Sequence, residues 1–420
     1  MRRAKFAIST SLLLAVSFIF GFGWRDVRSG AWPSVGALSE LFGRARTTSQ
    51  AADAVFRNAY NRITSDYIRP VEPKTLKYAG MGGMMAALGD PHTLFLPQEA
   101  ARAFAEDTQG TLVGIGAKLA RDPLGTRVDK VFEGTPAYRA GLRKGDVITG
   151  VDGKPVAGKD VDEIVAMVRG EEGKIVKLTV IKPGSAKPVV LSIKRARIVA
   201  PTIESQYFAD SHVGLMVIYQ FAENTPDQFD HELASLEKED LRGLVIDLRG
   251  NPGGLLQSTV EMLSRFVEDK LVVKMRSRDG AEEVARTFSG YRSDGLGVPI
   301  IVLVNEDTAS AAEIFAGVLH DYRLATIVGE HTYGKASVQN IFSLRDGSSA
   351  KVTIARYFLP SGVDIGRRVD EDGLYISGGL QPDIKFVPDP DDPDIKIGDS
   401  KHDPQLRKAI DLILAKQPKD

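Results

Sequence analysis

The sequence of 420 residues contains no cysteine, so disulfide bonds, thiolate metal ligands and a cysteine nucleophile are all excluded. It also lacks an excess of charge of either sign, because 54 Lys and Arg residues stand against 55 Asp and Glu residues, a formal net charge of -1. We therefore expect no nucleic-acid binding driven by overall charge. What is present is length and 43% hydrophobic residues, enough to build the cores of two or three domains.

The N-terminus has the features of a targeting segment. The basic start MRRAK is followed by residues 6–24, which carry no charge, and Arg25 and Asp26 end the run. A basic flank before an uncharged apolar run predicts an export signal or a single membrane anchor. No A-x-A cleavage pattern is present, so we slightly favour a retained anchor. We expect residues 6–24 to contact the membrane, and the rest of the chain to be exported to the periplasm or another extracytoplasmic space.

Composition and periodicity divide the chain into segments. A tether is followed by a helical pattern, then by short strands with glycine turns, and then by alternating strands and helices. This alternation predicts βαβ units with a largely parallel, covered sheet. A last helix should begin with Asp403 as its N-cap and Pro404 in its first turn. The segments are a signal or anchor (1–24), a linker (25–50), an N-terminal helical region (51–108), a strand-rich domain (109–198), an α/β domain (199–388), and a linker with a C-terminal helix (389–420).

The strand-rich segment, residues 109–198, contains the run GTPAYRAGLRKGDVITGVDG and resembles a PDZ domain over nearly its whole length. PDZ domains bind an extended peptide by adding it as a strand to a sheet edge, and loop amides capture the terminal carboxylate. We expect the loop LVGIGA to play this part. The candidate peptide-binding residues are Leu112, Val113, Gly114, Ile115 and Gly116. The alternative is a PDZ domain used only for packing between domains.

A single serine, Ser310, follows the buried apolar run PIIVLVN and precedes a helix in the stretch NEDTASAAEIFAG. In alternating α/β folds, reactive groups collect where strands end and helices begin. A serine at such a place is often only a helix cap. We expect Asp307 or Thr308 to cap this helix, which leaves Ser310 free to act as a nucleophile.

A nucleophilic serine needs a base, because its hydroxyl is scarcely ionised at neutral pH. No Gly-x-Ser-x-Gly elbow is present, and among the 6 histidines only His331 stays open as that base. Lys335 is the favoured candidate, because the Gly, Ala and Val around it would desolvate the amine and lower its pKa. Gln339, four residues on in a predicted strand, should project from the same face and hold the amine by a hydrogen bond.

A third motif, VIDLRGNPGGLL, ends a buried strand in a glycine-rich loop before a helix. Backbone N–H groups in such a loop can point into open space and stabilise the anion of a tetrahedral intermediate. The same loop could equally bind a phosphate or form a plain tight turn.

Together, DLRGNPGG, TASAAEI and YGKASVQ, in this order and behind a PDZ module, resemble the carboxy-terminal processing proteases, also called tail-specific proteases. LGDPHTLFLPQEA, FLPSGVDI and GLQPDI are similar to further segments of that family, and the likeness covers residues 51–415. The resemblance implies an α/β fold with a crotonase-like (ClpP/crotonase-type) protease core, an inserted PDZ domain and an N-terminal helical segment.

The resemblance also implies roles for single residues. Ser310 would be the nucleophile, Lys335 the general base and Gln339 the residue that orients Lys335. The backbone amides of Gly253 and Ala311 would form the oxyanion hole.

One residue outside this set, Arg169, is a candidate for gating, because it ends the PDZ helix and could report peptide binding to the protease core. An exposed cation that favours the helix dipole is the alternative reading of Arg169.

The predicted function is that of a serine endopeptidase of the Ser/Lys dyad type, which cleaves exported proteins recognised by their apolar C-terminal tails through the PDZ domain. No metal and no cofactor is implied. The alternatives are a catalytically silent PDZ scaffold outside the cytoplasmic membrane and an acyl-CoA enzyme of the crotonase type. The sequence leaves open an adaptor or activator protein and a homo-oligomer.

Overall fold

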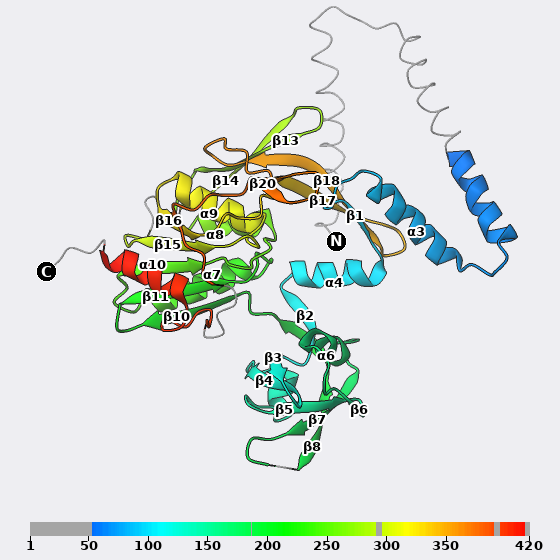
Figure 1. The fold of residues 1–420 in the computed structure, drawn as a ribbon, viewed down its shortest axis with the longest axis horizontal. Coiled ribbons are helices and arrows are strands. Elements are labelled where there is room, and N and C mark those ends of the chain that lie inside the picture. The colour runs from blue at the N-terminus through cyan, green and yellow to red at the C-terminus, as the bar shows by residue number, and fades with distance from the viewer. Residues whose placement is uncertain (1–52, 186, 291–295, 390–394, 416–420) are drawn as a thin grey trace, which may run out of the picture. The chain divides into compact units, whose positions relative to one another are not determined.

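A computed structural model describes residues 53–420 except 186, 291–295, 390–394 and 416–420 (Figure 1). The predicted anchor and linker, residues 1–50, lie outside the described part of the chain. Within that part, no helix is long and apolar enough to cross a membrane. The chain divides into two units, Met1–Met84 and Met85–Asp420.

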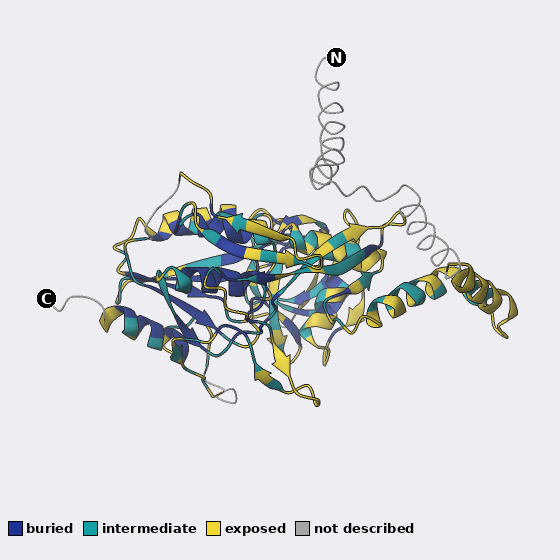
Figure 2. Cartoon of the chain, turned by 90° about the horizontal axis from the view of Figure 1, so that it is seen from above, coloured by how far each residue is buried: buried dark blue, intermediate teal, exposed yellow. Residues whose placement is uncertain are grey.

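The first unit is helical where it is described, as the sequence predicts. Residues 53–66 lie in a helix, and α3 (Pro73–Ala86) follows. Proline is well tolerated at the start of α3, because its missing N–H has no partner in the first turn of a helix. No residue of α3 is buried (Figure 2).

The strand-rich domain of the second unit is built on an antiparallel sheet of order β3-β4-β5-β7-β8, with β6 paired to β5. Its core holds aliphatic side chains that alternate along the strands, among them the fully buried Val176, Leu178 and Val180. The elements are β2 (Thr111–Gly114), β3 (Ala117–Asp122), β4 (Gly125–Val131), α5 (Pro136–Arg139), β5 (Val147–Val151), β6 (Lys154–Pro155), α6 (Val161–Val168), β7 (Ile175–Ile181), β8 (Pro188–Lys194) and β9 (Ala196–Val199).

The α/β region centres on a six-stranded sheet of order β10-β11-β12-β15-β16-β21. Only the β10 edge pairs antiparallel within this sheet, and the remaining pairs are parallel, which confirms the predicted largely parallel sheet. Its elements are β10 (Ile203–Phe208), β11 (Val213–Ile218), α7 (Thr225–Leu236), β12 (Gly243–Asp247), α8 (Leu256–Leu263), β15 (Ile300–Val304), α9 (Ala311–Asp321), β16 (Ala325–Gly329), β21 (Ile384–Lys385) and α10 (Pro404–Ala415).

Helices cover both faces of this sheet (Figure 1). Ile246 and Val302 share one core with α7, α8 and α9, whereas Val245 and Ile301 face α10 in another. Because both faces are buried, these strands are continuous apolar runs. The sequence predicted a linker and then a helix at the C-terminus, but α10 is an integral part of the second core, in which Leu406 and other residues of α10 are buried.

A second, antiparallel sheet has the order β1-β18-β13-β14, with β17 paired to β18. It matters for the site because β17 begins two residues after Lys335. The bounds are β1 (Leu94–Leu96), β13 (Leu271–Ser277), β14 (Glu282–Arg286), β17 (Ser337–Ser343) and β18 (Ser349–Phe358), with α4 (Gln98–Thr108) and the pair β19 (Arg368–Val369) and β20 (Tyr375–Ser377) beside them in sequence.

Candidate active site

Ser310 lies between β15 and α9, and its backbone is strained. Its φ of 56° and ψ of -118° fall where residues with a side chain rarely occur. Such a conformation costs of order 1–3 kcal/mol and is retained mainly at functional sites. The structure also corrects the expected cap. Ser310 itself, rather than Asp307 or Thr308, precedes α9, and the Thr308 hydroxyl instead donates to the Leu248 carbonyl oxygen at 2.8 Å.

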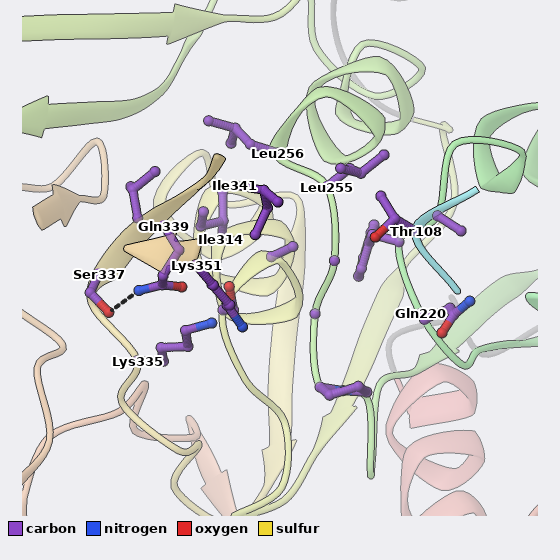
Figure 3. Close-up of a pocket in the computed structure, with 18 of the residues that line it drawn as sticks. Thr108, Gln220, Leu255, Leu256, Ile314, Lys335, Ser337, Gln339, Ile341 and Lys351 are labelled. Carbon is purple, nitrogen blue, oxygen red and sulfur yellow. Dashed lines mark hydrogen bonds between the residues drawn. The ribbon is translucent and has the colours of Figure 1, made fainter. Parts of the chain in front are cut away.

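A pocket of about 380 Å³ contains Ser310 together with Lys335 and Gln339. Its walls are mostly apolar. Figure 3 shows Lys335 and Gln339 on one wall, with Leu255 and Gln220 across the cavity. The fold thus brings the three residues predicted for the dyad and its support into one cavity, although they come from two loops and a strand.

Lys335 is partly buried at the start of the segment that leads into β17. Burial is the main cause that lowers the pKa of its amine to about 8; the nearby charge of Lys351 contributes to this shift, whereas the charges of Glu313 and Asp90 oppose it. An amine with such a pKa is neutral in an appreciable fraction of molecules near neutral pH and can accept a proton.

Gln339 is bound differently from the prediction. Its Nε2 donates to Ser337 Oγ at 2.8 Å and to Thr353 Oγ1 at 3.1 Å (Figure 3). No hydrogen bond within the described residues joins it to Lys335. The reason is local: Lys335 precedes β17, and a register shift between Val338 and Gln339 interrupts the simple alternation that the prediction assumed.

The alternative base, His331, is not among the described residues that line this pocket. Its ring stacks on Tyr375, with the centroids 3.9 Å apart. His331 therefore has a packing role in this structure.

The glycine-rich loop presses against Ser310. Gly253 has a φ of 100°, and a Cβ there would lie 2.7 Å from Ser310 Cβ and 2.8 Å from the Ala311 nitrogen, so only glycine fits. The Gly253 amide donates to Oδ1 of the fully buried Asn251 at 2.8 Å. The Ala311 amide has no hydrogen-bond partner in the part of the chain that is described. In this conformation, only the Ala311 amide of the two predicted oxyanion donors is available.

A buried network of charged side chains connects the glycine-rich loop to the residue that precedes α10. Arg249 places its guanidinium between Asp247 and Asp403, with 2.6 Å from Nη2 to an oxygen of each. The side chain of Arg249 is 7% exposed, and those of the two carboxylates are 1% and 0% exposed. Asp403 also accepts from the amides of Gln405 and Leu406, which confirms its predicted role as the N-cap of α10.

Two residues in the surroundings of the site had no role in the sequence-based prediction. Glu313, in the first turn of α9, is fully buried and accepts hydrogen bonds from both the Ser310 and the Lys335 amides. Lys351, on β18, lines the pocket. An acidic residue three positions after a serine at a helix start is a recognisable capping pattern, so Glu313 carried a signal. Lys351 carried none, because its approach to Lys335 depends on strand pairing.

A second cavity, of about 90 Å³, lies on the strand-rich domain. Four of the predicted peptide-binding residues line it, namely Leu112, Gly114, Ile115 and Gly116, and they are joined by apolar residues of β3 and α6. Val113 lines a neighbouring cavity instead. Within the described residues, the amides of Ile115 and Gly116 have no hydrogen-bond partner. Arg169, at the end of α6, is exposed and borders both cavities.

Comparison with protein families identifies two parts of the chain. Residues 212–386 match peptidase family S41, and residues 127–182 match the PDZ domain. The chain contains an S41 peptidase domain. All three motifs of the candidate site lie inside this S41 domain, and Phe132, Val165, Val168 and Arg169 of the second cavity lie inside the PDZ match.

Two curated relatives share this arrangement of sequence over most of the chain. A protein named "Probable CtpA-like serine protease" of Staphylococcus haemolyticus (strain JCSC1435) is 34% identical over 330 residues, which are 78% of this chain and 64% of that protein. A protein of the same name from Staphylococcus aureus (strain MSSA476) is 36% identical over 339 residues, 80% of this chain and 65% of that protein. The chain thus spans slightly less than two thirds of the length of these relatives.

A solved structure from Bacteroides fragilis NCTC 9343, provisionally assigned as an S41 protease, has a TM-score of 0.52 at 15% identity. The match covers 86% of this chain and 97% of that one. At this identity the likeness shows the fold alone, a mixed α/β arrangement with the S41 and PDZ domains described above.

Proposed function

We propose that the protein is a serine endopeptidase in which Ser310 and Lys335 form a catalytic dyad. The observation that carries the proposal is the shared pocket, which is lined by a strained serine and by a partly buried lysine whose pKa is lowered, mainly by burial, to about 8. The S41 match and the CtpA-like relatives support the same reaction class.

In the proposed mechanism, neutral Lys335 removes the hydroxyl proton of Ser310 as its Oγ attacks the scissile carbonyl. The lysine then returns that proton to the leaving amine, and an acyl-enzyme remains on Ser310. Water, activated by the same amine, hydrolyses the ester and restores Ser310. Gln339 restrains the wall beside Lys335 through its bonds to Ser337 and Thr353.

Charge on the tetrahedral intermediate needs hydrogen-bond donors near Ser310. The Ala311 amide is suited to this role, because it follows the nucleophile and has no partner in the described chain. The Gly253 amide would be the second donor after it leaves Asn251, to which it donates at 2.8 Å. The oxyanion hole is then completed as the substrate binds.

Substrate selection is assigned to the PDZ domain. The apolar walls of its groove suit an apolar C-terminal side chain, and the unpaired amides of Ile115 and Gly116 suit a terminal carboxylate. The substrates are then exported proteins with apolar C-terminal tails, and the predicted N-terminal segment, residues 6–24, would keep the enzyme on the outer side of the cytoplasmic membrane.

The test compares cleavage of an unfolded protein with an apolar tail by the full-length parent and by Ser310→Ala and Lys335→Ala, followed by mass spectrometry. We expect cleavage by the parent alone, unchanged by a chelator and lost when the substrate tail is made charged. Lys385→Ala, an exposed lysine on β21, is the matched control and should cleave like the parent.

Equal cleavage by the parent and Ser310→Ala would overturn the nucleophile. If no form cleaves, a fluorophosphonate serine probe separates two cases. Labelling of the parent that is lost in Ser310→Ala indicates a competent enzyme without its substrate. No labelling, together with binding of an apolar tail peptide, would leave the PDZ scaffold as the better description.

A further inference from the structure

A fully buried carboxylate, that of Glu313, lies in the first turn of α9. Its Oε2 accepts the Ser310 amide at 2.8 Å and the Lys335 amide at 2.9 Å. Its Oε1 accepts the Gly334 amide at 2.7 Å and the Thr332 hydroxyl at 2.5 Å. Both oxygens of one side chain are therefore saturated by groups from the loops that carry Ser310 and Lys335.

This pattern exceeds what helix capping requires. In a capping box, the acidic side chain returns to the amide of the residue before the helix, here Ser310. The other three donors belong to residues 332–335, which lie 19 to 22 positions further along the chain. A capping residue without a second purpose would not be buried beneath the loop of the proposed base.

The loop held by Glu313 is also fixed from its other side. Thr332 exchanges two hydrogen bonds with Leu380, since its amide donates to the Leu380 carbonyl at 3.1 Å and its Oγ1 accepts the Leu380 amide at 2.7 Å. The Gly334 carbonyl accepts the Arg367 amide at 2.8 Å. With those contacts in place, the bonds to Glu313 determine how this loop meets α9.

The bonding pattern fits an ionised side chain. Burial raises the pKa of Glu313 above its usual value, and its hydrogen bonds with Thr332, Gly334, Ser310 and Lys335 oppose this shift only in part. Three of the four donors are backbone N–H groups, which cannot reverse their direction, so an acceptor is needed on both oxygens. The charge has one further consequence, because it raises the pKa of the Lys335 amine.

We propose that Glu313 is a positioning residue that fixes the nucleophile Ser310 and the base Lys335 relative to each other by accepting hydrogen bonds from the backbone amides of both. The proposal rests on the dyad function proposed above. Glu313 does not contact the substrate in this scheme. It stabilises the strained backbone of Ser310, whose φ is 56°, and keeps the base loop beside it.

The test uses Glu313→Gln in the full-length chain. The amide has almost the shape of the acid, but its NH2 group would face two N–H or O–H donors, so one side of the linkage is lost. A displacement of about 1 Å can reduce a rate by about 10²-fold. We therefore expect kcat to fall by about 10²-fold, while KM for a substrate with an apolar tail stays within about threefold, because the PDZ groove is not altered.

A pH profile separates positioning from general structural damage. Loss of the negative charge lowers the pKa of Lys335, since that charge raises it in the parent. In a plot of the remaining activity against pH, the rise on the acidic side (the acidic limb) should therefore move to lower pH. Glu330→Gln removes a carboxylate from the adjoining loop and outside the pocket, and it should leave both kcat and this limb unchanged.

Two variants of Thr332 keep the proposal testable if Glu313→Gln fails to fold, which thermal unfolding would reveal. Thr332→Ser keeps the hydroxyl that bonds to Glu313 and should retain most of the parent kcat. Thr332→Val removes it, together with the acceptor of the Leu380 amide, and should lose kcat by at least about tenfold, the effect expected from the lost hydrogen bond to the charged group alone.

The outcomes separate this proposal from the dyad itself. Failure of the parent to cleave and to react with a fluorophosphonate would remove the proposed function. An active parent with a folded Glu313→Gln that has the parent kcat and the same acidic limb would overturn the role of Glu313 alone. Equal kcat for Thr332→Ser and Thr332→Val would also overturn it.

Discussion

The pocket of the S41 domain and the groove of the PDZ domain are built in opposite ways. Behind the pocket, buried charged groups connect distant segments: Arg249 joins the glycine-rich loop to α10, and Glu313 joins the loops of Ser310 and Lys335. The groove has apolar walls and leaves the amides of Ile115 and Gly116 unpaired within the described chain.

The difference fits the roles proposed for the two sites. A catalytic site must hold its groups within a fraction of an ångström, and a saturated buried polar network provides that rigidity. A strand-addition groove obtains its affinity from hydrogen bonds that the peptide itself completes, so its donors must stay free until the peptide arrives. Mutations should therefore affect stability and kcat at the first site and KM at the second.

The largest effect is expected from Arg249→Met. It leaves Asp247 and Asp403 buried without their cation, and breaking a buried pair in this way costs about 3–5 kcal/mol of unfolding free energy. Urea denaturation measures the loss. Arg276→Met is the matched control, because the Arg276–Glu282 pair is exposed and worth only about 0–1 kcal/mol. Similar losses for both variants would contradict the anchoring role.

The strain at Ser310 predicts an unusual order of stabilities. The free energy of unfolding, measured by urea denaturation, should be about 1 kcal/mol larger for Ser310→Gly than for Ser310→Ala, because glycine adopts a positive φ without strain. Both variants should be inactive. At Ser258, in α8, the order should reverse, because glycine weakens a helix. If Ser310→Gly is no more stable than Ser310→Ala, the backbone at this position is not strained.

A charge in the groove should affect binding only. Val165→Glu places a carboxylate on α6 at the wall of the PDZ groove, where it repels the terminal carboxylate of a tail. We expect KM for an apolar-tailed protein to rise by about tenfold, equal to about 1.4 kcal/mol, with kcat within about twofold. Val190→Glu, 63% exposed on β8 and outside the groove, should change neither. A fall of kcat in Val165→Glu would mean that the two sites are coupled.

The smallest effect concerns pH. Activity should rise through about pH 8 as Lys335 loses its proton. The charge of Lys351 lowers the pKa of Lys335, so Lys351→Met should raise that pKa and move the acidic limb to higher pH, with lower activity at pH 7 and similar activity well above pH 8. Lys385→Met serves as the control. A limb that stays in place would show that Lys351 does not influence the base.

The parallel sheet of the S41 domain and the N-cap of α10 were predictable from local pattern. Runs such as those of β12 and β15 are apolar because both faces of the sheet are covered, and an acidic residue before Pro404 is a strong start signal. The nucleophile and base could be proposed from three short motifs, each of which places a glycine or a small residue where the backbone must turn.

The remaining features depend on contacts between distant segments. The bond of Gln339 to Thr353 follows from a register shift in β17, which residue spacing cannot reveal. The Gly253 amide donates a hydrogen bond to Asn251, and the sequence could not predict this because every residue type except proline has the same backbone donor.

The sequence by itself determined the elements and the chemical groups, because hydrophobic period, turn residues and reactive side chains are local properties of the chain. Only the tertiary structure decided how those groups meet. Glu313 reaches the Lys335 loop, Lys351 approaches Lys335, and Arg249 reaches α10 through packing of segments far apart in sequence. Hydrogen bonds and charges act over a few ångströms, so their effects are set by the folded distances and not by residue number.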